Sequence, residues 1–147
     1  MAQGHQHIEF ATDLSSHLPS VVGDPIAFRR ILENLAANAV DSMQSRPGRI
    51  TISTQVIERS NEPPAVRVTV ADNGRGMSRD ETGKIFNDFY TTKEGGTGLG
   101  LSIVRRLVMD LHGTLRVESE PGAGSRMIVQ MPANRSEGKG KRAKFDL

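Results

Sequence analysis

The 147-residue chain contains no cysteine and no tryptophan, and aromatic residues make up only 4% of it. Without cysteine it can form neither a disulfide framework nor a thiolate metal site. It also lacks an apolar run near the ~20 residues that a membrane-spanning helix needs, and residues 1–10 lack the apolar core of a signal peptide. We therefore expect a cytoplasmic domain without membrane contact. A hydrophobic content of 36% is enough for one core.

Charge is unevenly distributed along the chain. Residues 134–147 contain five Lys and Arg residues against two acidic residues, a net charge of +3, whereas the whole chain carries only +2. The remainder, at −1, offers no basic surface of the kind that binds nucleic acid. We expect a polar, disordered segment over residues 1–7, one folded domain over residues 8–132, and a disordered basic tail over residues 133–147.

Asp24 and Pro25 predict the start of a long helix, because a carboxylate N-cap followed by proline suits the first helical turn. This helix should end near Gln44, before a proline and a glycine. The other expected elements are an edge strand over residues 7–14, neighbouring strands over 49–58 and 65–72, a short helix from Ser78 to about Phe86, a helix from Leu99 to His112 with Gly113 at the C′ position, and a hairpin of strands over 114–120 and 125–131.

Polar side chains form a second stripe on the long helix, beside its apolar face. Asn34, Asn38 and Asp41 occupy positions i, i+4 and i+7. Asparagine is an indifferent helix former, so two of them one turn apart call for an explanation. A binding function and a solvated flank explain them equally well from this helix alone.

The second predicted strand ends in an aspartate followed by two glycines. Asp72, Gly74 and Gly76 suit a site where a carboxylate accepts a hydrogen bond and the backbone lets a planar ligand approach. An ordinary Asx turn explains the same residues without any ligand.

Residues 95–101 contain four glycines and run directly into an apolar-periodic helix. Free N–H groups and the helix dipole favour an anion such as phosphate at such an N-terminus, although a tight packing corner is the commoner reason for the pattern. The preceding residues 87–94 have no clear period and predict a long polar loop over the site.

Together these motifs resemble the catalytic, ATP-binding domain of bacterial sensor histidine kinases. That domain belongs to a superfamily with gyrase B, Hsp90 and MutL (the Bergerat fold). Each motif is weak alone, but five in this order are specific. The motifs are Asn34 with Asn38, Asp72 with Gly74 and Gly76, Phe86 with residues 89–93, Gly96 to Leu101, and Gly122 with Gly124 and Ser125. The lid predicted over the site, from about Arg79 to Gly96, is most similar to that of kinases of the nitrogen-regulation type.

The resemblance implies ATP and Mg²⁺ as cofactors and assigns roles at the adenine end. Asp72 would accept the exocyclic amine of adenine, and Ser125, where the family usually has threonine, would contact the base directly or through water. Gly74 and Gly76 would let the strand end approach the base.

At the phosphate end the resemblance implies a catalytic set of Asn34, Asn38 and Lys93. Asn38 would bind Mg²⁺ with Asn34 in support, and Lys93 would neutralise the phosphates as a mobile charge. Backbone amides of the glycine-rich segment would meet the phosphates. That segment consists of Gly96, Thr97, Gly98, Leu99, Gly100 and Leu101.

Two departures from related patterns shape the expected activity. Gyrase-like ATPases have a glutamate as general base where this chain has Asn34, and Glu33 projects about 140° around the helix from Asn38. We therefore expect slow hydrolysis and phosphotransfer to a histidine. None of the four histidines has the helical context of a phosphoacceptor, so the acceptor would lie on a separate dimerisation domain that serves a response regulator.

Two other functions fit the same motifs: an anti-sigma-factor-type serine kinase, and a non-enzymatic nucleotide-responsive module. In all three cases the resemblance implies an α/β fold. We expect a two-layer sandwich, with a mixed, mostly antiparallel sheet of about five strands covered on one face by two long helices and a short one.

Overall fold

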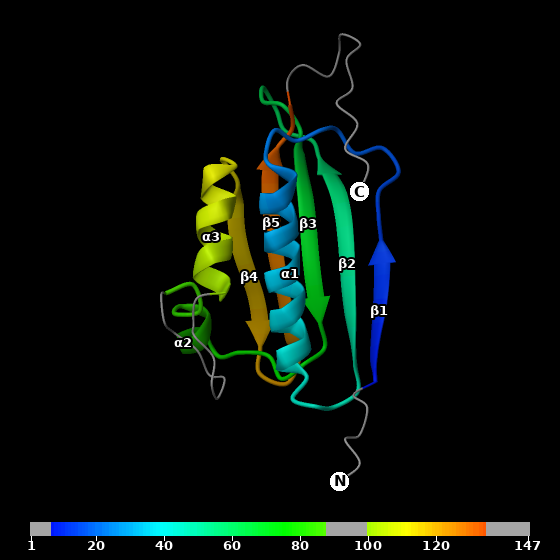
Figure 1. The fold of residues 1–147 in the computed structure, drawn as a ribbon, viewed down its shortest axis with the longest axis vertical. Coiled ribbons are helices and arrows are strands. Elements are labelled where there is room, and N and C mark those ends of the chain that lie inside the picture. Colours follow the sequence, from blue (N-terminus) through cyan, green and yellow to red (C-terminus); the bar gives the residue numbers. More distant parts are fainter. Residues whose placement is uncertain (1–6, 88–99, 135–147) are drawn as a thin grey trace.

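The computed structural model describes residues 7–87 and 100–134. In this part of the chain the elements are β1 (Ile8–Asp13), α1 (Pro25–Ser42), β2 (Gly48–Ile57), β3 (Ala65–Asp72), α2 (Arg79–Thr82), α3 (Gly100–Asp110), β4 (Thr114–Glu120) and β5 (Gly124–Pro132). The strands form one sheet in the order β1-β2-β3-β5-β4, in which β1 and β2 are parallel and the other neighbours antiparallel. Helices α1 and α3 lie against one face of it (Figure 1). The expected two-layer α/β sandwich is confirmed.

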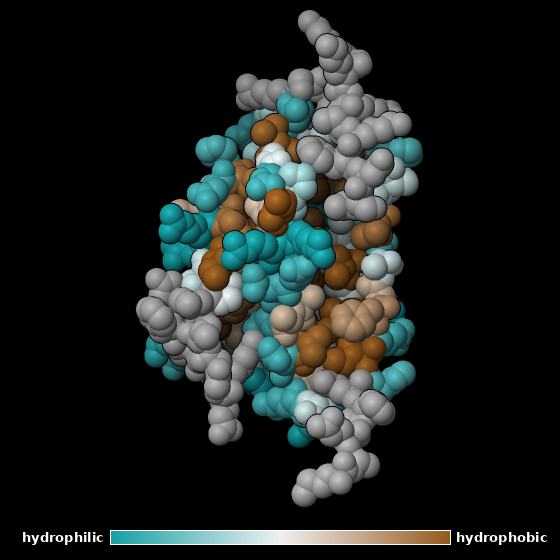
Figure 2. Space-filling model, viewed as in Figure 1, coloured by the Kyte–Doolittle hydropathy of each residue, from teal (hydrophilic) through white to brown (hydrophobic). Residues whose placement is uncertain are grey.

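Helix α1 begins as its sequence predicts and packs its apolar stripe inward. The Asp24 carboxylate accepts the N–H of Ile26 at 2.9 Å, and Pro25 follows at the first helical position. Its buried side chains join the core against the sheet, and they are Ile31, Leu35 and Ala39. The helix ends at Ser42, two residues earlier than expected, because Gln44 takes a left-handed backbone conformation with φ of 53°. Figure 2 shows the hydrophilic surface that gathers over the middle of the helix layer.

Strand β5 is the last described strand in sequence but lies inside the sheet, between β3 and β4. Its register with β3 pairs Asp72 with Ser125, and its register with β4 pairs Ser119 with Ser125. Three polar residues from three strands therefore lie side by side at one end of the sheet.

Helix α2 is shorter than expected and stops at Thr82 rather than near Phe86. The Ser78 hydroxyl caps it by accepting the N–H of Glu81 at 3.3 Å, as the capping-box pattern predicts. The helix then meets Gly83, a poor helix former, and the chain continues in turns.

Helix α3 ends in a Schellman motif with a histidine where a glycine was expected. His112 takes the left-handed conformation with φ of 58°, and the N–H of Gly113 bonds to the carbonyl of Val108 at 3.0 Å. His112 is therefore the C′ residue, and Gly113 follows one position later. Gly113 is needed there for space, since a Cβ atom would lie 2.7 Å from the carbonyl oxygen of Gln130.

Backbone contacts continue two residues past the expected end of the domain at residue 132. Ala133 is buried and forms an isolated bridge with Val21, and the N–H of Asn134 bonds to the carbonyl of Ser20 at 2.7 Å. The expected disorder of residues 1–6 and 135–147 concerns residues outside the described ranges.

Among the helices of residues 7–87 and 100–134, none has the length and apolar character needed to cross a bilayer.

Gly124 allows β5 to start directly against the end of β3. It has a φ of +83°, and a Cβ atom there would collide with the carbonyl oxygen of Asp72. A side chain at this position would force the two strand ends apart. The Asp72–Ser125 pairing thus depends on a glycine.

Gly124→Ala should destabilise the domain more than Gly122→Ala. Both glycines are left-handed, which costs any other residue about 1–2 kcal/mol, but a Cβ atom at Gly122 meets nothing within 4 Å. We expect a further cost of about 1–3 kcal/mol at Gly124 from the collision. Urea denaturation of the two variants measures the difference, and equal costs would show that the close contact is not required.

Candidate functional site

The site starts at the end of β3, where Asp72 holds a half-buried carboxylate. It accepts the N–H of Gly74 at 2.9 Å and the N–H of Ser125, and it lies beside the Ser42 hydroxyl, which donates to the carbonyl of Ala39 at 2.7 Å. Burial raises the pKa of Asp72 above its ordinary value of 3.8, and the three neighbours Gly74, Ser42 and Ser125 offset only part of that effect. The bond to Gly74 is also an Asx turn, so the simple alternative to a ligand site is present as well.

Ser125 lies next to Asp72 in the strand register, and Ser119 lies on the other side of Ser125, on β4. Ser125 is only 5% exposed, and its Oγ lies 2.7 Å from Oγ of Ser119 on β4. The Ser119 hydroxyl also accepts the N–H of Met77 at 2.8 Å and lies 3.0 Å from the carbonyl oxygen of Gly124. The predicted Ser125 is therefore part of a polar cluster that includes Ser119, a residue not predicted from the sequence.

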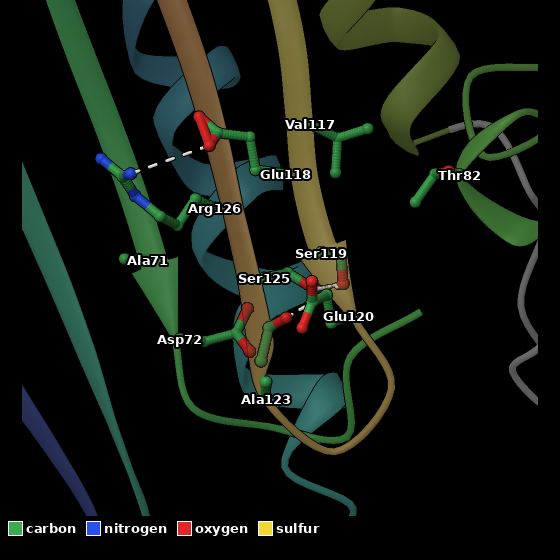
Figure 3. Close-up of a pocket in the computed structure, with 11 residues that line it drawn as sticks. Ala71, Asp72, Thr82, Val117, Glu118, Ser119, Glu120, Ala123, Ser125 and Arg126 are labelled. Carbon is green, nitrogen blue, oxygen red and sulfur yellow. Dashed lines mark hydrogen bonds and ion pairs between the residues drawn. The ribbon is translucent and has the colours of Figure 1, made fainter. Parts of the chain in front are cut away.

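A cavity of about 620 Å³ opens beside these residues (Figure 3). Its volume falls within the range of small-molecule sites. The lining residues are Ala71, Asp72, Thr82, Val117, Glu118, Ser119, Glu120, Ala123, Gly124, Ser125 and Arg126. A half-buried carboxylate and two hydroxyls on its wall favour a ligand that brings hydrogen-bond donors.

The predicted asparagines, Asn34 and Asn38, do not line this cavity. They lie on α1, away from the cavity. Asn34 donates its Nδ2 to the carbonyl of Arg30 at 2.9 Å. Its Oδ1 lies 3.6 Å from where a Cβ atom on Gly100 would stand, so the structure brings Asn34 to the N-terminus of α3. Asn38 follows one turn later and is partly exposed.

Ser42 continues this stripe to the Asp72 carboxylate. Asn34, Asn38 and Ser42 are spaced four residues apart, so the stripe covers about 12 Å along the helix axis. One end meets the first turn of α3 and the other meets Asp72. The arrangement suits an elongated ligand whose two ends differ chemically.

Close packing requires glycine at positions 74 and 76. A Cβ atom on Gly74 would collide with the Ser42 side chain, and one on Gly76, which has a φ of +68°, would collide with the carbonyl oxygen of Glu120. These contacts fasten the segment after β3 to the end of α1 and to β4. A direct role of either glycine toward a ligand stays a prediction.

Five predicted site residues lie outside the described residues: Lys93, Gly96, Thr97, Gly98 and Leu99. The predicted lid, from about Arg79 to Gly96, also lies outside them from residue 88 onward. Gly100 and Leu101 begin α3, and the partly buried side chain of Leu101 packs against the core. Any ligand contact of Leu101 is therefore expected from its backbone.

Within residues 7–87 and 100–134, no group of three or more His, Asp or Glu side chains could hold a metal ion. A cation at Asn38 would need oxygen ligands from water and from a bound anion. Mg²⁺ commonly binds in this way, because it keeps several waters and takes few protein ligands. The amide oxygens of Asn34 and Asn38 fit that ion better than a softer metal.

Residues 23–135 match the family model described as histidine kinase-, DNA gyrase B- and HSP90-like ATPase. The chain belongs to this family. The catalytic-domain resemblance seen in the sequence is thereby confirmed, and the fold and the relatives agree with it.

Relatives and solved structures of this family are similar to most of the chain. The sensor histidine kinase ZraS of Escherichia coli (strain K12) is 32% identical over 129 residues, which are 88% of this chain and 26% of ZraS. AtoS of the same strain, a signal transduction histidine-protein kinase, is 33% identical over 127 residues, or 86% of this chain and 20% of AtoS. The chain thus spans about a quarter or less of these relatives.

Among solved structures, full-length ShkA in complex with AMPPNP has a TM-score of 0.74 and 34% identity, covering 87% of this chain and 26% of ShkA. The catalytic domain of the histidine kinase ThkA has a TM-score of 0.70 and 30% identity, covering 86% of this chain and 79% of that domain. The match therefore places this chain on the catalytic domains of such kinases.

Asp72 should make the free energy of unfolding decrease as the pH rises, whereas a salt-bridged aspartate makes it increase. Because its folded-state pKa is raised, the folded state holds the proton more tightly than the unfolded state. The stabilisation from this proton is fully present below pH 3.8 and is lost as the pH rises through the folded-state pKa. We expect the unfolding free energy of the wild type, relative to Asp72→Asn, to fall over that interval.

Denaturation of the nucleotide-free protein across a pH series measures this difference. The control is the same substitution at exposed Asp13 on β1. A difference that stays level, or that moves in favour of the wild type as the pH rises, would contradict the assignment.

Proposed function

We propose that the chain binds Mg·ATP and donates the γ-phosphoryl group to a histidine on a separate dimerisation domain. Through that domain it would serve a response regulator in two-component signalling. The observation that carries the proposal is the half-buried Asp72 carboxylate, which faces a cavity at the end of β3 in a chain of this ATPase family. Its similarity to sensor histidine kinases favours a histidine acceptor over the serine-kinase alternative.

Adenine would bind at the Asp72 end of the site. An ionised carboxylate accepts an N–H bond from the exocyclic amine, whereas the O6 atom of guanine would set acceptor against acceptor. Sites that hydrogen-bond a substrate group reject analogues without it strongly. Ser125 lies beside Asp72 in the register and lines the same cavity.

The phosphates would bind toward the first turn of α3. The helix dipole favours an anion at this N-terminus, and Gly100 adds no side chain in front of Asn34. Lys93 and the glycine-rich segment would add positive charge and backbone donors. Mg²⁺ would neutralise charge on the phosphates, with Asn38 as its protein ligand and Asn34 in support.

Slow hydrolysis is expected because Asn34 stands where gyrase-like ATPases have a glutamate as general base. Asn34 cannot take up a proton. Glu33 is engaged elsewhere, since its carboxylate pairs with Arg29 at 2.8 Å on the exposed side of α1. A site that holds ATP without activating water leaves the γ-phosphoryl group for another acceptor.

The wild-type chain should bind Mg·ATP more tightly than Mg·GTP, and Asp72→Asn should weaken ATP binding by about 1.5–3 kcal/mol, the scale of a hydrogen bond to a charged group. Titration calorimetry measures both, with Asp13→Asn as the control. Equal affinities for the two nucleotides would contradict the proposal.

The acceptor is identified by adding a dimerisation domain and γ-labelled ATP. We expect acid-labile phosphohistidine on that domain. Acid-stable phosphoserine on a protein substrate would favour the serine-kinase alternative. Tight binding without transfer to any acceptor would favour a regulatory module.

Asn34→Glu should raise ATP hydrolysis, because it places a carboxylate one turn from Asn38. General-base assistance is typically worth 10²–10⁴-fold, so even a poorly placed base gives a measurable gain. Phosphate release at saturating Mg·ATP measures it without the affinity term. The control is Asn34→Gln, which adds the same length without a base. Rapid hydrolysis by the wild type would show that another residue activates water.

A further inference from the structure

Ser119 makes three polar contacts, and together they define where the hydroxyl protons of Ser119 and Ser125 point. Its Oγ accepts the N–H of Met77 at 2.8 Å, lies 3.0 Å from the carbonyl oxygen of Gly124, and lies 2.7 Å from Oγ of Ser125. A serine hydroxyl has one proton to donate and two lone pairs to accept with. All of the bonding capacity of Ser119 is therefore used inside the protein.

The three contacts can form together in only one arrangement. The carbonyl of Gly124 can only accept, so Ser119 donates its single proton there. One of its lone pairs takes the N–H of Met77, which leaves the other lone pair for Ser125. Ser125 must then be the donor in the bond between the two serines.

The consequence reaches the cavity through Ser125. With its proton turned toward Ser119, the Ser125 hydroxyl has only lone pairs to offer to a ligand. Asp72, its neighbour in the register, presents a carboxylate that also accepts. The cavity wall therefore presents two adjacent acceptors, which suit an amino group with two N–H bonds and oppose a keto oxygen.

We propose that Ser119 is a positioning residue for base selection, because it holds the Ser125 hydroxyl as a pure acceptor toward the 6-position of a bound purine. This inference rests on the proposed function, since it supposes that a purine nucleotide occupies the cavity. Without Ser119, the Ser125 hydroxyl is free to rotate and can donate to a keto oxygen. Selection for the amine would then relax even though Asp72 is intact.

A purely structural role for Ser119 makes a different prediction. Its bonds tie β4 to Met77 and to the start of β5, so removing them should lower stability in either case. A structural role would leave the ratio of affinities for two purine nucleotides unchanged. The ratio therefore separates the two roles.

The test compares ATP with inosine triphosphate, whose base carries a keto oxygen at C6 in place of the amine and a proton on the neighbouring ring nitrogen N1. Calorimetry on the full chain gives the affinity ratio for the wild type and for Ser119→Ala. One neutral hydrogen bond is worth about 0.5–1.5 kcal/mol, so we expect the ratio to fall about 2- to 13-fold in Ser119→Ala. Ser119→Thr keeps the hydroxyl and should keep the ratio.

The matched control is Thr54→Val on β2. The Thr54 hydroxyl also accepts a backbone N–H, that of Ser15 at 2.9 Å, and Thr54 does not line the cavity. This variant loses a similar bond and should keep the ratio of the wild type.

Ser125→Ala provides a second route if Ser119→Ala does not fold. Removal of an acceptor-only hydroxyl should weaken ATP binding relative to inosine triphosphate, and adding Ser119→Ala to it should change the ratio no further. A wild-type preference for ATP that survives unchanged in either serine variant would overturn the inference and leave the proposed function standing. A wild type without that preference would sink the proposed function, and this inference with it.

Discussion

The whole site depends on the backbone contact between the end of β3 and the start of β5. Gly124 lies so close to the carbonyl of Asp72 that no side chain fits between them. This contact sets the register that pairs Asp72 with Ser125, and the next pairing brings Ser119 alongside. The acceptors on the cavity wall are thus positioned by main-chain geometry rather than by flexible side chains.

The second part of the site is positioned by α1, a single rigid element. Its stripe of Asn34, Asn38 and Ser42 connects the first turn of α3 with the Asp72 carboxylate. A displacement of α1 along its own axis would shift the polar groups at both ends together. The helix therefore fixes the distance between the part of the site that suits a base and the part that suits phosphates.

Local signals in the sequence were sufficient for most of the fold. The Asp24 cap, the apolar stripe of α1 and the period-two strands are short-range patterns, and the bounds of β3 agree with those predicted. The left-handed conformation at His112 was harder to predict, because that conformation ordinarily favours glycine. The glycine here is Gly113, one residue later, where crowding against β5 leaves no room for a side chain.

The polar residues that the sequence did not single out are those whose role depends on strand pairing. Ser119 is one polar residue in an alternating strand, and nothing nearby in the sequence marks it. Ser42 had a signal, since it continues the four-residue spacing of the asparagines. Its contact with Asp72, however, needs the turn after β3 to fold back onto α1.

The interior place of β5 has a consequence for the order in which the domain can fold. Strands β3 and β4 each pair with β5 and not with each other. Synthesis of the chain must therefore reach nearly residue 132 before the complete sheet can form. Until then β3 and β4 each have an open edge, the kind of surface that pairs with other chains. Long-range strand pairing of this type also slows folding. A fragment cut before β5 would therefore lose the middle of its sheet and expose two aggregation-prone edges.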